Sequence, residues 1–332
     1  MELKSIEKSF EESMKDYHVK EKSKHWKKRF GLTKKLYNLK NLKNFRNNNL
    51  SDNLDDKHPF ENQKKNFKRF KSEVPKKFYS KYLSKVNIGN NRFYFDHEGF
   101  TIDSNEIFII KWLYDIRKFI FLKKNNIYCE IGAGYGALAS KILKNRKSKY
   151  IIIDLPEALF LSAYFLKENF KNKKICLYSD LKSKTIDSNL IERYDIFLIP
   201  PWVKLSDNLK IDFFINTRSF SEMNSEIIGK YFELIQKHIN KNGFFLNINR
   251  YEKSTVGQSI KFYKFPYDFH WEKLISKKSW NQDNIHFLLT KRVEKAKIDL
   301  YFVKVKTLFI FLNISFKKKL GKFKRTILQL ID

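Results

Sequence analysis

The sequence predicts an α/β fold with a parallel sheet and an antiparallel last strand, preceded by a mostly helical N-terminal region. Three observations favour this fold. From residue 127 onward, short apolar runs alternate with helical patterns, as in parallel strands joined by right-handed crossovers. A buried-type strand at 127–131 runs directly into a glycine-rich turn and a helix. Finally, the runs at 269–275 and 285–290 are typical of a closing antiparallel pair.

The composition fits one large domain with extensions at both ends. A chain of 332 residues with 42% apolar residues can bury a sizeable core. No apolar stretch near the N-terminus resembles a secretory signal, and the longest apolar run, at 308–312, is too short to span a bilayer. The cysteines Cys129 and Cys176 lie in strand-like runs, which favours buried free thiols. We therefore expect a cytoplasmic protein.

The formal net charge is +31, which is consistent with nucleic acid or an anionic membrane as a partner. A compositional explanation competes with this one. The chain prefers Lys to Arg and is rich in Asn, Ile and Phe, as an AT-rich coding sequence would produce. Its lysines are spread along the whole chain and carry no RNA-binding motif with them. We favour the compositional explanation.

The chain divides into three parts by sequence character. Residues 1–90 are Lys-rich and mostly helical, with a loop or linker at 47–53. Residues 91–292 carry the alternating strands and helices. Residues 293–332 form a basic extension with apolar clusters. This extension is expected either to pack on the domain or to contact a membrane, which would be the inner membrane surface.

The elements of the central part follow in order. Asp103 is expected to cap a helix whose apolar face is core, with Glu106 reaching back. The second strand, at 150–153, ends at Asp154, and Pro156 suits the first turn of a helix that runs to about 170. Further strands are expected at 174–178, 195–199, 212–216 and 244–248. A helix before the last of these is expected to begin in a Ser219–Glu222 capping box and end at Asn242-Gly243.

The turn after the first strand has the sequence Gly132-Ala133-Gly134-Tyr135-Gly136 and is preceded by Glu130. Alternate glycines allow a tight turn and a close approach of the backbone to a ligand. A carboxylate in front of the turn would repel a pyrophosphate. It suits a ligand with a positive end, such as the ammonium group of an amino acid.

The same turn also matches G-x-G-x-x-A, a dinucleotide fingerprint, and Asp154 follows at the expected distance. Three features favour S-adenosylmethionine over a dinucleotide: Glu130, the third glycine Gly136, and the antiparallel final strand. Asp154 would then accept hydrogen bonds from both ribose hydroxyls. The alternative role for Asp154 is to cap the helix that follows it.

Three stretches carry a resemblance to a known family. The E-x-G-x-G-x-G arrangement at 130–136 resembles the first motif of class I S-adenosylmethionine-dependent methyltransferases, which are Rossmann-like. The D-L-P-E stretch at 154–157 resembles the second motif of small-molecule O-methyltransferases. The stretch at 212–223, with 197–202 before it and 231–234 after it, resembles a family of sugar O-methyltransferases. The resemblance covers roughly residues 90 to 292.

The resemblance implies S-adenosylmethionine as cofactor and a sugar hydroxyl, on a glycan or a nucleotide-sugar precursor, as acceptor. Cofactor contacts are expected from Glu130, the three glycines, Asp154 and Leu155. Asp180 is the candidate for the adenine amino group. If 195–199 is the true third strand, the segment ending at Trp202 lies there instead.

The segment Ile199-Pro200-Pro201-Trp202 also resembles the motif of nucleic-acid amino-methyltransferases. In those enzymes a polar first residue accepts from the target amine, and the aromatic residue stacks on a flipped base. Ile199 cannot accept, so base methylation is the minor alternative. Trp202 is expected to stack on the adenine or a sugar, or simply to pack. A third hypothesis is a non-catalytic, membrane- or polyanion-associated protein with a degenerate fold.

Residues after later strands are expected near the methyl donor, because ligands bind at the carboxyl ends of parallel strands. Transfer to a hydroxyl also calls for a base. Glu222 is one candidate, with the capping box as its alternative role. His270 is another, whereas His286 lies in an apolar strand-like run and is expected to be core, as His270 also could be. No metal cluster with ligand spacing is apparent, and the oligomeric state stays open. The candidate acceptor-binding residues are Asn216, Arg218, Ser219, Arg250 and Tyr251.

Overall fold

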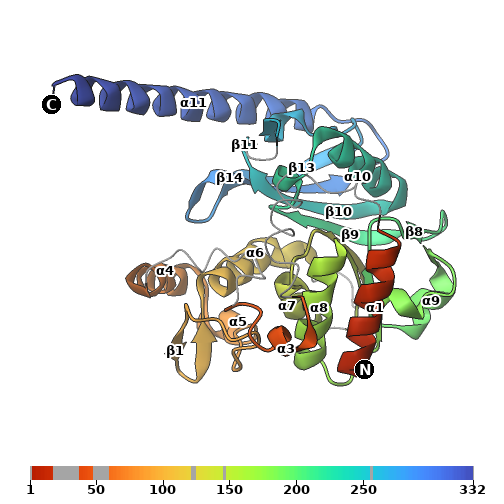
Figure 1. The fold of residues 1–332 in the computed structure, drawn as a ribbon. Helices are drawn as coiled ribbons and strands as arrows, with labels where there is room; N and C mark the ends of the chain where they lie inside the picture. Colours follow the sequence, from red (N-terminus) through yellow and green to blue (C-terminus); the bar gives the residue numbers. More distant parts are fainter. Residues whose placement is uncertain are drawn as a thin grey trace.

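The computed structural model describes residues 2–17, 37–47, 60–120, 125–144, 147–254 and 257–331. In these residues, helices cover both faces of an eight-stranded sheet (Figure 1). The predicted α/β fold, with an antiparallel last strand and a mostly helical N-terminal region, is confirmed. Apart from Asn47, the predicted linker at 47–53 lies outside the described residues.

The sheet has the order β13-β14-β10-β9-β3-β4-β7-β5. Strand β14 runs antiparallel to both of its neighbours, and all the other pairings are parallel. The strand bounds are β3 Ile127–Ile131, β4 Lys149–Ile153, β5 Ile175–Cys176, β7 Ile196–Ile199, β9 Ile211–Thr217, β10 Ile239–Arg250, β13 Trp271–Ser279 and β14 Gln282–Arg292.

Two sets of helices bury the two faces of the sheet. One face carries α6 (Ser104–Ile120), α7 (Ala137–Leu143) and α8 (Pro156–Asn169). The other face carries α9 (Ser188–Arg193), α10 (Ser225–His238) and the first part of α11 (Asp299–Ile331). The central strands are therefore mostly apolar, as strands covered on both faces are, with polar residues such as Glu130 and Asn216 near their carboxyl ends.

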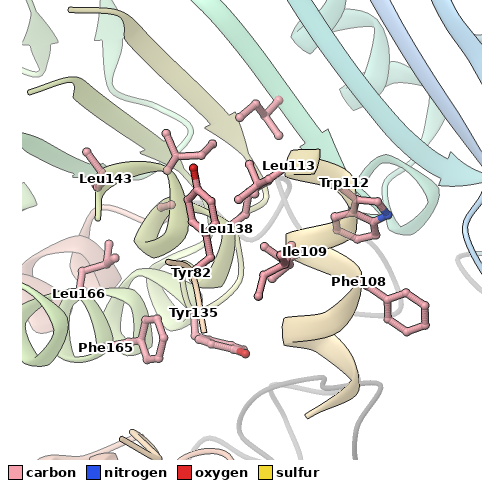
Figure 2. Packing of buried hydrophobic residues seen from close by; sticks show 14 of the residues in the cluster. Tyr82, Phe108, Ile109, Trp112, Leu113, Tyr135, Leu138, Leu143, Phe165 and Leu166 are labelled. Carbon is pink, nitrogen blue, oxygen red and sulfur yellow. The ribbon is translucent and has the colours of Figure 1, made fainter. Parts of the chain in front are cut away.

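The first face is a continuous core of large side chains. Figure 2 shows Ile109 and Leu113 of α6 lying beside Leu138 of α7, in agreement with the contact between these helices. Trp112 is also buried, and its indole N–H donates to Ser279 at 3.2 Å. The apolar stripe predicted on α6 is thus core, as expected. Burial of each such side chain contributes about 1.5–3 kcal/mol.

The N-terminal region packs into this same core. Helix α1 (Leu3–Lys15) lies against α8, and α4 (Phe60–Glu73) lies against α6. Phe45 and Phe70 are fully buried. Short helices and strands complete the region and the loops: α3 Leu39–Leu42, α5 Lys76–Tyr79, β1 Phe95–His97, β2 Phe100–Ile102, β6 Thr185–Ile186, β8 Lys204–Leu205, β11 Glu252–Lys253, β12 Ile260–Lys261, and the 3-10 turns η4 Tyr178–Asp180, η5 Phe220–Glu222 and η6 Phe262–Lys264.

The predicted bounds of α10 are wrong at both ends. The helix begins at Ser225, where Asn224 Oδ1 accepts the Ile227 N–H at 2.8 Å, and Ser219 makes no capping bond. It ends at His238. Asn242-Gly243 is instead part of β10, in an irregularity where Asn242 has φ 62°. The Asn-Gly pair that indicated a helix end therefore marks a strand bulge.

Of the capping box predicted for α6, the bond to Asp103 is present and the return bond from Glu106 is not. Asp103 Oδ1 accepts the Glu106 N–H at 2.8 Å, as expected. Glu106 does not reach back. Its carboxylate accepts the Ser84 N–H at 2.8 Å and pairs with buried Lys141. The other oxygen of Asp103 pairs with Arg46 at 2.6 Å, and both side chains are only 7% exposed. This ion pair ties the N-terminal region to the start of α6.

The C-terminal helix α11 packs on η6 and β13 and then continues past the body of the domain (Figure 1). Leu300, Val303 and Thr307 are buried in this contact. In the part of the chain that the structure describes, no helix is both long enough and apolar enough to cross a membrane.

Arg46→Met should destabilise the protein by about 3–5 kcal/mol, because it leaves the Asp103 carboxylate buried without its partner. Burial alone would raise the pKa of Asp103, but the charge and hydrogen bond of Arg46 outweigh it and lower that pKa. The difference in unfolding free energy between the unaltered protein and Arg46→Met should therefore become smaller as pH falls and Asp103 is protonated. Urea unfolding at several pH values measures it.

Lys8→Met is the matched control for Arg46→Met. It removes an ion pair to Glu12 whose partners are 70% and 39% exposed, so the expected loss is under about 1 kcal/mol. Equal losses for the two variants would contradict the structural importance of the buried pair.

Candidate functional site

The carboxyl ends of β3, β4, β7, β9 and β10 lie at one edge of the sheet, because these strands run parallel. Most of the residues singled out in the sequence lie in the loops at this edge. In such sheets, ligands bind at this edge.

The three glycines of the turn all have left-handed φ values, of 72°, 61° and 83°. Their surroundings differ. A Cβ on Gly132 would collide with Ser219, and one on Gly136 would press on Leu166. A Cβ on Gly134 would meet nothing within 4 Å. Gly132 and Gly136 thus serve internal packing, and Gly134 is the glycine past which a ligand can come close to the backbone.

Asp154 holds the glycine turn. Its Oδ2 accepts the Gly134 N–H at 2.8 Å and its Oδ1 accepts the Leu155 N–H at 2.8 Å. Leu155 is the N-cap of α8 without any side-chain capping bond, so the helix-capping role is not what Asp154 performs. A carboxylate oxygen has two lone pairs, and each can accept a further donor. Burial raises the pKa of Asp154 to about 7, against the effect of the two N–H groups.

Glu130 lies beneath the turn at the end of β3 and is 1% exposed. The hydroxyl of Tyr150, on the neighbouring strand β4, donates to its Oε2 at 2.7 Å. Burial raises the pKa of Glu130 to about 8, and the nearby charge of Asp154 adds to the shift. Glu130 and Asp154 thus lie close enough to influence one another, in an environment that disfavours two negative charges.

The strand order decides which segment lies beside Asp154. Strand β7 pairs directly with β4, and β5 lies outside it at the edge of the sheet. The segment Pro200-Pro201-Trp202 therefore follows the strand next to Asp154. Asp180 follows the edge strand, is exposed, and accepts the Leu177 N–H at 2.8 Å. This placement does not support Asp180 as the acceptor for an adenine amino group.

Trp202 is packed against Tyr17, which lies just beyond the end of α1. Its ring stacks on Tyr17 with centroids 5.5 Å apart, and its indole N–H donates to the Tyr178 hydroxyl at 3.1 Å. Tyr178 in turn donates to Asp16 at 2.5 Å, and Lys184 donates to the same oxygen at 2.9 Å. Sequence reasoning missed Asp16, Tyr17 and Tyr178, because no local pattern links residues more than 160 positions apart.

Three side chains form a buried polar cluster at the ends of β9 and β10. The Asn216 amide donates to Ile131 O at 2.8 Å and to Ser219 Oγ at 2.6 Å. Its oxygen accepts the Phe220 N–H at 3.2 Å and the Asn249 amide at 2.7 Å. Asn216 and Asn249 are 0% exposed. Asn216 therefore holds strand ends together and has no surface toward an acceptor, contrary to the sequence-based expectation.

Tyr251, which the sequence predicted as an acceptor-binding residue, is also core. It is 2% exposed, and its hydroxyl lies 3.0 Å from Nδ1 of His286, whose Nε2 lies 3.1 Å from Ser276 Oγ. Burial lowers the pKa of His286 to about 3. His286 is thus a neutral, satisfied core histidine, as expected.

Two arginines lie at the carboxyl edge. Arg218 has a left-handed φ of 68°, and its guanidinium lies over Trp112 at 5.1 Å and Phe108 at 5.8 Å. Arg250 ends β10 and is half-buried. Among the described residues, no carboxylate lies within ion-pair distance of Arg250. It is the free cation of this edge within that part of the chain.

The two candidate bases lie at different edges. Glu222, in η5, pairs with Lys253 at 2.7 Å, with the side chains 18% and 13% exposed. Its charge contributes to the raised pKa of Asp154, so the two carboxylates are near one another. His270 precedes β13, which runs parallel to β10, and therefore lies at the amino edge. The prediction of His270 as a catalytic base is wrong for this reason.

The sheet order and the reversed β14 are those of the class I methyltransferase fold. No protein-family model matches the sequence, and no curated protein matches it. In the described residues, no group of three or more His, Cys, Asp or Glu side chains could hold a metal ion. Cys129 and Cys176 are buried and free.

Solved structures with a similar fold include three methyltransferases. One from Pyrococcus furiosus is 12% identical, covering 70% of this chain and 99% of its own, with a TM-score of 0.39. An S-adenosylmethionine-dependent one from Aquifex aeolicus is 14% identical over 54% of this chain and 89% of its own, with a TM-score of 0.34. An RNA methyltransferase from Salinibacter ruber, bound to S-adenosylhomocysteine, is 7% identical over 58% of this chain and 94% of its own, with a TM-score of 0.32. This likeness is one of general fold.

Substituting the glycines separates their two roles. Gly132→Ala should destabilise the protein by more than about 2 kcal/mol, because the methyl group collides with Ser219 and the φ is left-handed. Gly134→Ala meets open space and should cost only the backbone strain of about 1–2 kcal/mol. Urea unfolding measures both, and a larger loss for Gly134→Ala would show that the turn is packed differently.

Proposed function

We propose that this protein transfers a methyl group from S-adenosylmethionine to a sugar hydroxyl. The observation that carries the proposal is the pair of neighbouring carboxylates, Glu130 at the end of β3 and Asp154, which holds the open Gly134. A dinucleotide turn needs a neutral or positive approach for its pyrophosphate, which Glu130 opposes, whereas Asp154 would suit the ribose of either cofactor. A cofactor with an ammonium group and a ribose, but no phosphate, fits this charge pattern.

The ribose, the ammonium group and the adenine of the cofactor would each meet a suitable group at the carboxyl edge of the sheet. Asp154 has lone pairs left on both oxygens after binding Gly134 and Leu155, and these suit two ribose hydroxyls. Glu130 supplies negative charge at the end of β3 for the ammonium group. The segment ending at Trp202 would lie on the adenine side of the bound cofactor, and Tyr17 and Tyr178 contact it there. When bound, the cofactor would supply the electrophilic methyl group.

A sugar hydroxyl as acceptor rests on the D-L-P-E and N-T-x-S-F-x-E-M stretches. The structure explains part of the second motif. Asn216, Ser219 and Phe220 are bonded to one another, so they shape the loop after β9. The same loop carries Glu222, which we propose as the base that takes the hydroxyl proton. Arg250 suits an anionic group on the acceptor, such as a phosphate.

The rival reaction, methylation of a nucleic-acid base, gains no support from Trp202. That side chain would have to stack on a flipped base. Its ring is already stacked on Tyr17, and its indole N–H is engaged by Tyr178. Ile199 moreover offers no side-chain acceptor for the target amine.

Cofactor binding is the first test. Calorimetry should show that S-adenosylhomocysteine binds and NAD does not. Asp154→Asn should weaken binding at least about tenfold, because it removes a charged acceptor of two hydroxyls. Asp195→Asn is a matched control: its carboxylate accepts the Lys174 N–H at the opposite end of β7. Binding of NAD alone would refute the proposal.

The affinity for S-adenosylhomocysteine should also fall as pH is lowered from 9 to 6. The pKa values of about 8 for Glu130 and about 7 for Asp154 in the free protein mean that both carboxylates gain protons over this range. The ligand requires their ionised forms, so affinity should drop by up to about tenfold per pH unit below each pKa. Calorimetry in buffers of different ionisation enthalpy should detect proton release, and a flat profile would contradict these assignments.

The acceptor is tested with labelled cofactor. The protein is incubated with extracted glycans and nucleotide-sugars in one arm and with RNA and DNA in the other, and mass spectrometry locates the methyl group. We expect an O-methyl sugar, with turnover reduced at least about a hundredfold in Glu222→Gln. Methyl incorporation into a base alone would favour the rival reaction, and no turnover despite cofactor binding would indicate a non-catalytic protein.

A further inference from the structure

Helix α11 presents large apolar side chains to solvent on the side away from the domain. Phe302, Phe309, Leu312 and Phe316 are 58%, 66%, 50% and 67% exposed. Their spacings of seven, three and four residues place them along one face of the helix. Single exposed apolar residues are ordinary, but a row of this kind marks an interaction surface. We call this row the outer face of α11.

The outer face is distinct from the face by which α11 is attached. The attached face contains Leu300, Val303, Thr307 and Phe311, all of them buried. Phe311 lies against the Tyr263 ring at 5.7 Å, and Lys261 Nζ lies 4.7 Å from its centroid. As far as Phe311 the helix is therefore fixed by one side, and Leu312 and Phe316 lie where it continues past the domain.

The positive charge of α11 indicates what kind of partner its outer face can bind. Between Asp299 and Asp332 the sequence contains no acidic residue. The same stretch contains eight basic residues: Lys304, Lys306, Lys317, Lys318, Lys319, Lys322, Lys324 and Arg325. A partner for α11 must thus offer both negative charge and an apolar environment.

We infer that the outer face of α11 binds the surface of an anionic phospholipid membrane. Its phenylalanines would enter the boundary between headgroups and acyl chains, and the lysines would contact the anionic headgroups. Two copies of α11 packed side by side in parallel would bring the lysines of both together, and in either orientation the second copy would offer no acidic residue between 300 and 331 to neutralise them. Nucleic acid would satisfy the lysines but leave the apolar row exposed to water.

The same surface is linked to the candidate site. Helix α11 packs on η6, and η6 follows the β11–β12 hairpin that carries Lys253, the partner of Glu222. A membrane bound at the outer face would thus be connected, through α11, η6 and the β11–β12 hairpin, to the side chain that pairs with the proposed base Glu222. The inference does not depend on the proposed reaction, because it rests on α11 alone.

Vesicle flotation with the full chain tests the inference. The protein should float with vesicles of phosphatidylcholine and phosphatidylglycerol and bind far less to phosphatidylcholine alone. Added salt should weaken the binding. The double variant Phe309→Ser/Phe316→Ser should lose at least about tenfold in partitioning, because two aromatic side chains no longer enter the lipid.

Phe269→Ser is the matched control, since Phe269 is also 66% exposed but precedes β13. It should float like the unaltered protein. Circular dichroism and S-adenosylhomocysteine binding should be the same for all variants, which excludes misfolding as the cause of a loss. Equal flotation of the double variant would overturn the inference. So would a dimer in light scattering that the double variant dissociates, or binding to RNA with no binding to vesicles.

Discussion

The amide of Asn216 holds together the strand ends on which the site depends. It bonds to the end of β3, to Ser219 and Phe220 after β9, and to Asn249 at the end of β10. Asn216 is 0% exposed, and at such a buried position an unpaired amide group would cost several kcal/mol. Parallel strands diverge into loops at their carboxyl ends. This one side chain keeps three of those ends in register beneath the glycine turn.

The arrangement around Asn216 explains why the turn is rigid on one side and open on the other. Ser219, fixed by Asn216, fills the space beside Gly132, while Gly134 faces open space and is held by Asp154 and by the Ser162 hydroxyl, which donates to its carbonyl. The carboxylates have raised pKa values because the turn shields them from water. An ammonium group near Glu130 would relieve this electrostatic stress, so ligand binding and ionisation are coupled.

Much of the fold could be predicted from local patterns. Strands β3 and β4, the glycine turn, and Glu130 and Asp154 follow from apolar runs and turn chemistry within about thirty residues. The position of β7 between β4 and β5 could not be predicted, because two short apolar strands of similar length have no local preference for either place. The role of Asn216 was missed because a polar residue at a strand end suggests a ligand. Only the tertiary structure shows that its bonds are already made.

The contact between Tyr17, just beyond α1, and Trp202 has a consequence for the order of folding. Asp16 and Tyr178 are separated by 162 positions, so α1 leaves the ribosome long before η4, β7 and Trp202 exist. A helix of thirteen residues is only marginally stable by itself in water. Closing so long a loop is entropically costly until the sheet has formed. The first element to be synthesised is thus among the last to be fixed, and newly made chains should pass through a state in which the sheet is complete but α1 does not yet cover α8 and η4.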